Sequence, residues 1–270
     1  MKKSIILPAV ALLALGVQQA NAYDAEVGIT YGFGDIEAGS ADADTTAYGI
    51  GGEFYFGGVD DSSGPLAEAP FVDRASSIFA SYSNTEIDFD FGDTDTDSYT
   101  LGGRYVDKAS GWLVGGSYSN TDNDDTDTDT LSFEVGKYVA DYTTVTFQYS
   151  LSDSDDNDTD AYGVEVEHLA ELGGESFLAI DGFIGTTQPD EGDDVFTLAG
   201  GVTYYVNTTL GFGTSYQLDD ADDSEITTVA FFATWFPAPN VELVASYSYA
   251  EEDELDIEID MINLGAALRF

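Results

Sequence analysis

Residues 256–270 read D-I-E-I-D-M-I-N-L-G-A-A-L-R-F, and this stretch decides how the rest of the chain is interpreted. Counting back from Phe270 in steps of two gives only apolar residues as far as Ile262, and the residues between them are smaller or more polar. A period of two over about ten residues predicts a β-strand with one apolar and one polar face. Such a strand could belong to a soluble sandwich, but its length matches a tilted bilayer crossing of roughly nine to eleven residues.

The start of the chain has the three parts of a secretory signal peptide. Two lysines give a charged start, residues 5–17 an apolar middle, and residues 20–22 an A-x-A cleavage site. The apolar middle is too short for a comfortable membrane helix, and no later stretch is longer. We therefore expect residues 1–22 to be removed on export. Residues 23–270 should form one outer-membrane β-barrel, because only helices and closed barrels satisfy their backbone groups in lipid.

The composition is strongly acidic, with 52 Asp and Glu against 7 Lys and Arg. Nucleic acid is excluded as a partner, because its phosphates would be repelled. The lack of cysteine excludes a disulfide framework, a thiol nucleophile and a thiolate metal site. The 17 Tyr, 17 Phe and 29 Gly suit the aromatic girdles and close-packed strands of a barrel. A disordered acidic secreted protein would share the charge, but its aromatic residues would not alternate.

The alternation of apolar and polar residues continues through the mature chain in fourteen segments. The expected strands are 24–33, 46–57, 74–86, 97–106, 111–120, 129–139, 142–151, 160–169, 176–186, 194–206, 208–218, 225–236, 241–250 and 256–270. The count is even, as in bacterial single-chain barrels, although one misread hairpin would give twelve or sixteen. The predicted fold class is all-β, a transmembrane antiparallel up-and-down barrel of about fourteen strands.

The connections between these strands alternate in kind. One set is short, apart from the longer 58–73. The other set is acidic and comprises 35–45, 87–96, 121–128, 152–159, 187–193, 219–224 and 251–256. Short turns belong on the periplasmic side of such barrels and longer loops outside, so acidic loops should surround the outer mouth. None of them is long enough to be an obvious constriction loop.

No motif indicates catalysis or a defined metal site. The D-T-D-T-D runs at 93–97 and 125–129 lack the glycine at position six and the glutamate at position twelve of a calcium-binding EF-hand loop. The single histidine, His168, has outward parity on its strand, and no G-x-S-x-G occurs. We therefore expect neither an enzyme nor a cofactor, and only diffuse cation binding by the acidic rim.

The parity fixed by Phe270 places a set of charged side chains on the inner face. These pore-lining candidates are Glu26, Glu53, Arg104, Glu134, Glu165, Glu167, Asp181, Glu242 and Arg269. Fourteen strands about 4.8 Å apart and tilted by about 40° close at a diameter of roughly 28 Å, which leaves room for water. The sequence thus predicts a passive, cation-preferring channel. The alternative is a non-conducting surface barrel whose acidic loops bind cations that bridge to lipopolysaccharide.

Residues 64–77 form a proline-bearing connection that is long enough to fold against the barrel floor. Their G-P-L-A-E-A start, the acidic loops and the closing Phe270 are similar to those of a family of general porins from gammaproteobacteria. The resemblance implies an outer-membrane pore for small hydrophilic solutes in a Gram-negative bacterium. Resemblance to other outer-membrane barrels implies that Phe270 helps the barrel assembly machinery to recognise the chain. Membrane lipid and lipopolysaccharide are further expected partners, and a homo-oligomer is left open.

Overall fold

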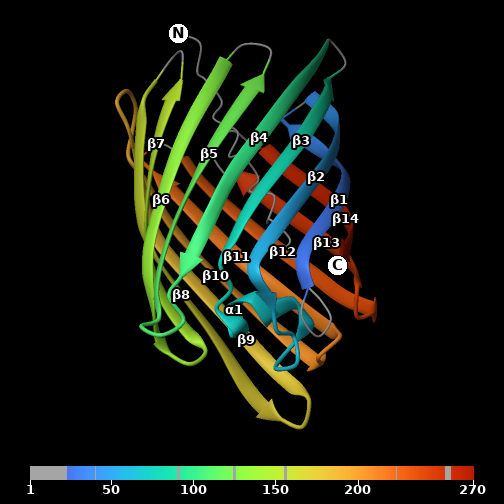
Figure 1. Ribbon diagram of the computed structural model, residues 1–270. Helices are drawn as coiled ribbons and strands as arrows, with labels where there is room; N and C mark the ends of the chain where they lie inside the picture. Colours follow the sequence, from blue (N-terminus) through green and yellow to red (C-terminus); the bar gives the residue numbers. More distant parts are fainter. Residues whose placement is uncertain are drawn as a thin grey trace.

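The computed structural model describes residues 23–39, 41–89, 92–123, 126–154, 157–222, 224–252 and 257–270. The predicted signal peptide lies outside the described residues, as does the start of the acidic run at 125. The described chain forms fourteen antiparallel strands that close into one barrel, with the last strand paired to the first (Figure 1). The predicted fold class and strand number are confirmed. No helix in the described ranges is long and apolar enough to cross a membrane.

The strands are β1 (Tyr23–Ala38), β2 (Ala41–Val59), β3 (Ser77–Phe89), β4 (Gly92–Val106), β5 (Trp112–Asn123), β6 (Thr126–Ala140), β7 (Thr143–Ser154), β8 (Thr159–Gly173), β9 (Ser176–Pro189), β10 (Val195–Asn207), β11 (Leu210–Ala221), β12 (Ser224–Ala238), β13 (Val241–Glu252) and β14 (Ile257–Arg269). We call the end that holds Tyr23 and Phe270 the plug end, and the opposite end the acidic end.

The strands extend further toward the acidic end than predicted. Strand β1 continues to Ala38 and β2 begins at Ala41, so most of the predicted loop 35–45 belongs to these two paired strands. The same holds at 87–96, where β3 ends at Phe89 and β4 begins at Gly92. Apolar alternation marks only the lipid-facing part of a strand, whereas the backbone ladder needs no apolar side chain. The predicted bounds of the acidic connections at 35–45 and 87–96 were therefore too wide.

Side-chain alternation matches a barrel that is apolar outside and polar inside. Val27, Ile29 and Tyr31 of β1 are exposed on the outer face, whereas Glu26 and Gly32, which flank them on the inward parity, are buried. A band of large apolar side chains continues around all strands in this way. Such a surface would be unfavourable in water but is expected where lipid surrounds the barrel.

The last strand closes the barrel through a seam of thirteen paired residues, from Glu26 opposite Arg269 to Ala38 opposite Ile257. Phe270 extends this seam. Its carbonyl accepts hydrogen bonds from the backbone N–H groups of Asp24 and Ala25 at 3.0 and 2.9 Å, and its own N–H donates to the Ala25 carbonyl at 2.9 Å. The side chain is 70% exposed and points outward.

The connection between β2 and β3, residues 60–76, is the plug. It contains the short 3-10 helix η1 (Leu66–Glu68) and the helix α1 (Ala69–Asp73). Pro70 lies in the first turn of α1, and Arg74 ends the helix in the left-handed region at φ 55°. Figure 1 shows α1 at the plug end, enclosed by the strands. This connection supplies the one large insertion into the interior among the described residues.

Candidate functional site

The barrel encloses a cavity of about 820 Å³. Its wall toward the acidic end carries rows of hydroxyl groups, because inward positions on neighbouring strands fall in register. One such row pairs Ser117 with Ser132 and Ser132 with Ser150, and all three line the cavity. These hydroxyls make the middle of the lumen polar but uncharged.

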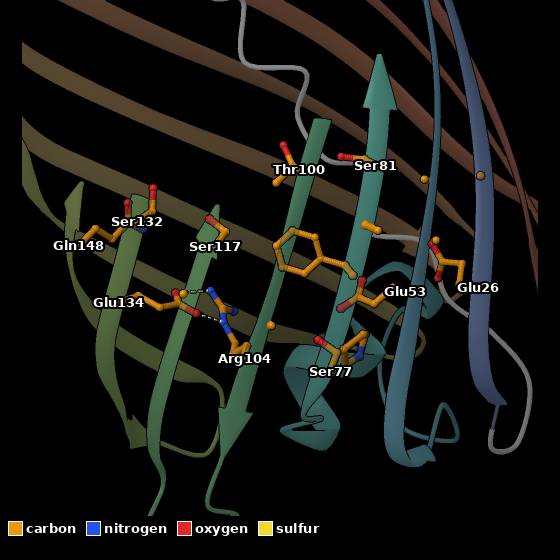
Figure 2. A pocket seen from close by; sticks show the side chains of 18 of the residues that line it. Glu26, Glu53, Ser77, Ser81, Thr100, Arg104, Ser117, Ser132, Glu134 and Gln148 are labelled. Atoms are coloured by element: carbon orange, nitrogen blue, oxygen red, sulfur yellow. Dashed lines mark hydrogen bonds and ion pairs between the residues drawn. The ribbon is translucent and has the colours of Figure 1, made fainter. Parts of the chain in front are cut away.

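A bidentate ion pair lies on the wall nearer the plug. The Nε and Nη2 atoms of Arg104 donate to the two carboxylate oxygens of Glu134 at 2.6 and 2.7 Å (Figure 2). The two residues lie on β4 and β6, and Gly115 of β5 stands between them in register. A side chain on Gly115 would overlap the Glu134 carboxylate. Glycine at this position therefore lets the pair form across the intervening strand.

A second group of inward carboxylates carries no basic partner. Gln148 donates to Glu165 at 2.7 Å, and Thr144 donates to Glu167 at 2.9 Å. Asp181 stands opposite Glu167 on the neighbouring strand. Among the described residues, no ion pair involves these three carboxylates. This part of the wall is consequently rich in carboxylates that make no ion pair among the described residues.

A third group lies at the seam and is almost fully buried, although Glu26 and Glu242 also border the cavity. The side chain of Arg269 has no exposed surface and lies 3.6 Å from Glu26 and 3.4 Å from Glu242. Thr234 donates a hydrogen bond of 2.5 Å to Glu242, and the guanidinium lies 4.5 Å from the centre of the Phe236 ring. Removing one member of such a cluster would leave buried charge uncompensated, which is strongly destabilising.

The nine pore-lining candidates thus all lie on the inner side of the wall, in different settings. Glu53 lines the cavity together with the Arg104–Glu134 pair, and Glu165, Glu167 and Asp181 form the unpaired group. Glu26, Glu242 and Arg269 form the buried seam cluster. Their role in conduction stays a prediction.

The plug forms the floor of the cavity. Ala67, Pro70, Phe71 and Ala75 line the cavity at this end. Phe71 packs against a cluster of Val106, Leu113 and Tyr138 on one side. With Ala67 and Val72 it also packs against a second cluster, formed by Leu169, Phe177 and Tyr205. Apolar contacts therefore hold the plug to strands on several sides of the barrel.

Polar contacts fix the same segment. The Leu66 N–H donates to the Thr208 carbonyl at 2.8 Å, and the Tyr138 hydroxyl donates to the Phe71 carbonyl at 2.9 Å. At the solvent-facing surface, Lys108 pairs with Asp73 at 2.9 Å. Sequence reasoning expected a segment that folds against the floor but missed its insertion into the lumen. The sequence signal for this insertion was the presence of apolar residues within a stretch that otherwise has the composition of a turn.

The outer face of the acidic end carries a belt of carboxylates. Aspartates stand opposite each other across the strands, as Asp35 does with Asp44 and Asp88 with Asp93. Tyrosines of the lipid-facing band donate to this belt, for example Tyr149 to Asp160 at 2.7 Å. Within the described part of the chain, no group of three or more His, Asp or Glu residues is arranged to hold a metal ion.

Comparison with solved structures shows the same fold in several outer-membrane proteins. Omp33 of Acinetobacter baumannii is 19% identical, with a TM-score of 0.64 over 93% of this chain and 100% of that chain. A bacterial polysaccharide outer membrane secretin is 11% identical, with a TM-score of 0.53 over 92% and 99%. OccK7 of Pseudomonas aeruginosa is 9% identical, with a TM-score of 0.50 over 92% and 99%.

The sequence comparisons identify the family. No curated protein matches the chain. A family model described as "Putative general bacterial porin" matches residues 1–149, more than half of the chain. This match agrees with the polar lumen and the apolar outer band. The chain therefore belongs to the general bacterial porin family.

Proposed function

We propose that the protein is a passive, water-filled channel of the outer membrane that admits small hydrophilic solutes and prefers cations. The cavity of about 820 Å³ inside a barrel of the porin family, with hydroxyl groups and the Arg104–Glu134 pair in its lining, carries this proposal. Family and fold indicate a channel rather than an enzyme. Short turns and both termini of such barrels lie on the periplasmic side. The plug end then faces the periplasm, and the acidic end faces outside.

Conduction requires the plug to move, because its residues form the floor of the cavity. The plug is a connection between two strands rather than a member of the sheet, so it can leave the lumen without breaking the barrel ladder. The channel proposed here is therefore closed in this conformation and conducts when residues 60–76 withdraw from the lumen.

The test is step conductance in a planar lipid bilayer. We would compare the intact protein with a variant in which residues 60–75 are replaced by a two-residue turn, like the turn at residues 208–209. The shortened variant should show stable, long-lived conductance steps, and the intact protein rarer or smaller ones. Absence of conductance from a correctly folded shortened variant would refute the channel.

Cation preference is supported by the charge of the lumen. The group of Glu165, Glu167 and Asp181 has no basic partner among the described residues, whereas Arg104 is matched by Glu134. Unit charges about 4 Å apart interact by roughly 1 kcal/mol in bulk water and by more near a low-dielectric wall. Since 1.4 kcal/mol corresponds to about a factor of ten, permeating cations should be favoured severalfold.

Reversal potentials across a gradient of dilute KCl measure this preference. Replacing Glu165 and Glu167 by glutamine and Asp181 by asparagine should weaken it, whereas replacing the exposed Glu171 and Glu175 by glutamine should leave it nearly unchanged. The preference should also fade toward 1 M salt, where the screening length is only about 3 Å. Anion preference in dilute salt would contradict this assignment.

The alternative, a non-conducting surface barrel, is favoured by the plug itself, which fills the plug end of the lumen. In this alternative the carboxylate belt would bind divalent cations diffusely and bridge to the phosphates of lipopolysaccharide. The shortened variant separates the two proposals. If the barrel has only a structural role, the variant without residues 60–75 should conduct poorly as well.

A further inference from the structure

Glu68 differs in its contacts from Asp60 and Asp73 of the plug. Asp73 pairs with Lys108 at the surface, and Asp60 accepts the Ser62 N–H at 2.9 Å in a turn. Glu68 instead points toward the inner wall and accepts a hydrogen bond of 2.6 Å from the hydroxyl of the buried Tyr205. Among the described residues, Glu68 makes no ion pair with a basic group.

Carboxylates on three strands around the plug act electrostatically on Glu68, and one of them, Glu242, also pairs with Arg269 at 3.4 Å. The three are Glu167 of β8, Asp181 of β9 and Glu242 of β13, and β10 supplies the Tyr205 hydroxyl. Burial raises the pKa of Glu68 most, the hydrogen bond from Tyr205 lowers it, and Glu167 and Asp181 raise it, so that the net pKa is about 7. A docked plug therefore favours the protonated form of this side chain. Protonation keeps the Tyr205 contact, because a neutral carboxyl retains an acceptor oxygen.

We propose that Glu68 is a proton-operated latch of the plug: the neutral carboxyl permits docking, and the ionised carboxylate, repelled by Glu167, Asp181 and Glu242, promotes release. This inference rests on the proposed channel function and adds its regulation. The latch joins a segment outside the sheet to β10 of the wall through the Tyr205 hydrogen bond. Its charge therefore acts on the position of the plug and leaves the barrel ladder intact.

The sign of the pH dependence follows from the two positions of Glu68. In a released plug the carboxyl meets water and has its ordinary pKa of 4.5, whereas in the docked plug its pKa is about 7. The docked state thus binds the proton more tightly. Docking is strongest below the lower value and weakens as pH rises through the higher one. The ratio of docked to released plug should fall by up to about tenfold per pH unit between them.

The experiment is the open probability of single channels in a planar bilayer between pH 5 and pH 8. For the intact protein we expect the ratio of open to closed time to rise by at least about tenfold over this range. Glu68→Gln should stay at the low-pH level throughout, because the amide resembles the neutral carboxyl. Glu175→Gln, a matched change in the exposed turn between β8 and β9, should behave like the intact protein. Full pH dependence in Glu68→Gln would overturn the latch.

A second variant tests the latch without altering the carboxyl. Tyr205→Phe removes the one contact that lowers the pKa of Glu68, so opening should shift to higher pH at unchanged single-channel current. An unshifted or oppositely shifted pH midpoint would contradict the latch. The variant without residues 60–75 distinguishes failure of the channel function from failure of the latch. If it is silent, the channel function itself is wrong. If it conducts while Glu68→Gln keeps its pH dependence, only the latch is wrong.

Discussion

The plug end and the acidic end of the barrel differ in whether their charged side chains are paired with opposite charges. At the plug end, four of the five basic residues in the described chain make ion pairs with carboxylates: Arg74, Arg104, Lys108 and Arg269. At the acidic end, carboxylate stands opposite carboxylate, as in Asp35 with Asp44. Like charges directly opposite one another destabilise a sheet.

This difference shows what holds each end. The plug end is stabilised by packing, hydrogen bonds and compensated charge around a folded insertion. The acidic end is held mainly by the backbone ladder, and its side chains repel each other. The plug end therefore holds the folded insertion in place, whereas the acidic end presents a highly charged surface. Removing a charged side chain at the plug end should destabilise the barrel, whereas removing one at the acidic end should stabilise it.

The largest effect should come from the closing residue. Phe270→Asp places a charge at the seam where the backbone of Phe270 joins Asp24 and Ala25, on the outward, lipid-facing side. We propose that this change impairs assembly and leaves most of the protein unfolded in the periplasm. Heat-modifiable migration on electrophoresis measures the folded fraction. Normal insertion of the variant would show that the terminal residue has no assembly role.

The next effect concerns the buried seam cluster. Arg269→Met leaves Glu26 and Glu242 buried without their basic partner, which should cost about 3–5 kcal/mol of stability. Lys108→Met, which removes an exposed ion pair at the same end, should cost less than about 1 kcal/mol. Urea unfolding in detergent or lipid compares the two. Equal losses of stability in the two variants would mean that the buried cluster contributes no more to stability than the exposed ion pair.

Packing of the plug should have a smaller effect that does not reach the barrel. Phe71→Ala removes a ring that contacts two apolar clusters, and truncation of a buried phenylalanine costs about 3–5 kcal/mol, less where it is partly exposed. We expect more frequent channel opening at nearly unchanged barrel stability. Leu172→Ala, at an exposed apolar residue near the same end, is the control. Equal opening in both variants would deny the plug its role in closure.

The smallest effect lies at the acidic end and has the opposite sign. Asp35 stands opposite Asp44 on β2 and Asp260 on β14. Asp35→Asn should therefore stabilise the barrel by a few tenths of a kcal/mol to about 1 kcal/mol in dilute salt. Thermal unfolding at low and high ionic strength checks this, because about 1 M salt should abolish the gain. A loss of stability would show that the repulsion is already compensated.

Most of the fold could be predicted from alternation alone. Strand β7, expected at 142–151, spans Thr143–Ser154. The ends at the acidic side could not be predicted, because the alternation that reveals a strand is imposed by lipid. Above the lipid band, Asp and Thr residues continue the ladder without an apolar signal. The extent of β1 and β2 through 35–45 illustrates this limit.

The sequence predicts which charged side chains of the candidate site point inward, but not which of them form ion pairs with each other. Parity from Phe270 indicates which charged residues point inward. It cannot tell that Arg104 reaches Glu134 across Gly115, since that contact depends on the register of three strands. It also cannot tell that Arg269 is covered by the plug, whose Leu66 carbonyl lies 3.5 Å from its guanidinium. Contacts between distant segments need the closed structure.

Reversible fixation of the plug tests the central claim most directly. The chain has no cysteine, so Asp73→Cys with Lys108→Cys introduces a unique pair at the surface ion pair between the plug and the β4–β5 turn. A thiol-specific, reducible cross-linker would tie the plug to the wall during bilayer recording at pH 8. We predict that the current disappears with the cross-linker and returns with reductant, and that neither single-cysteine variant responds. Current that persists while the plug is fixed would contradict closure of this porin by residues 60–76.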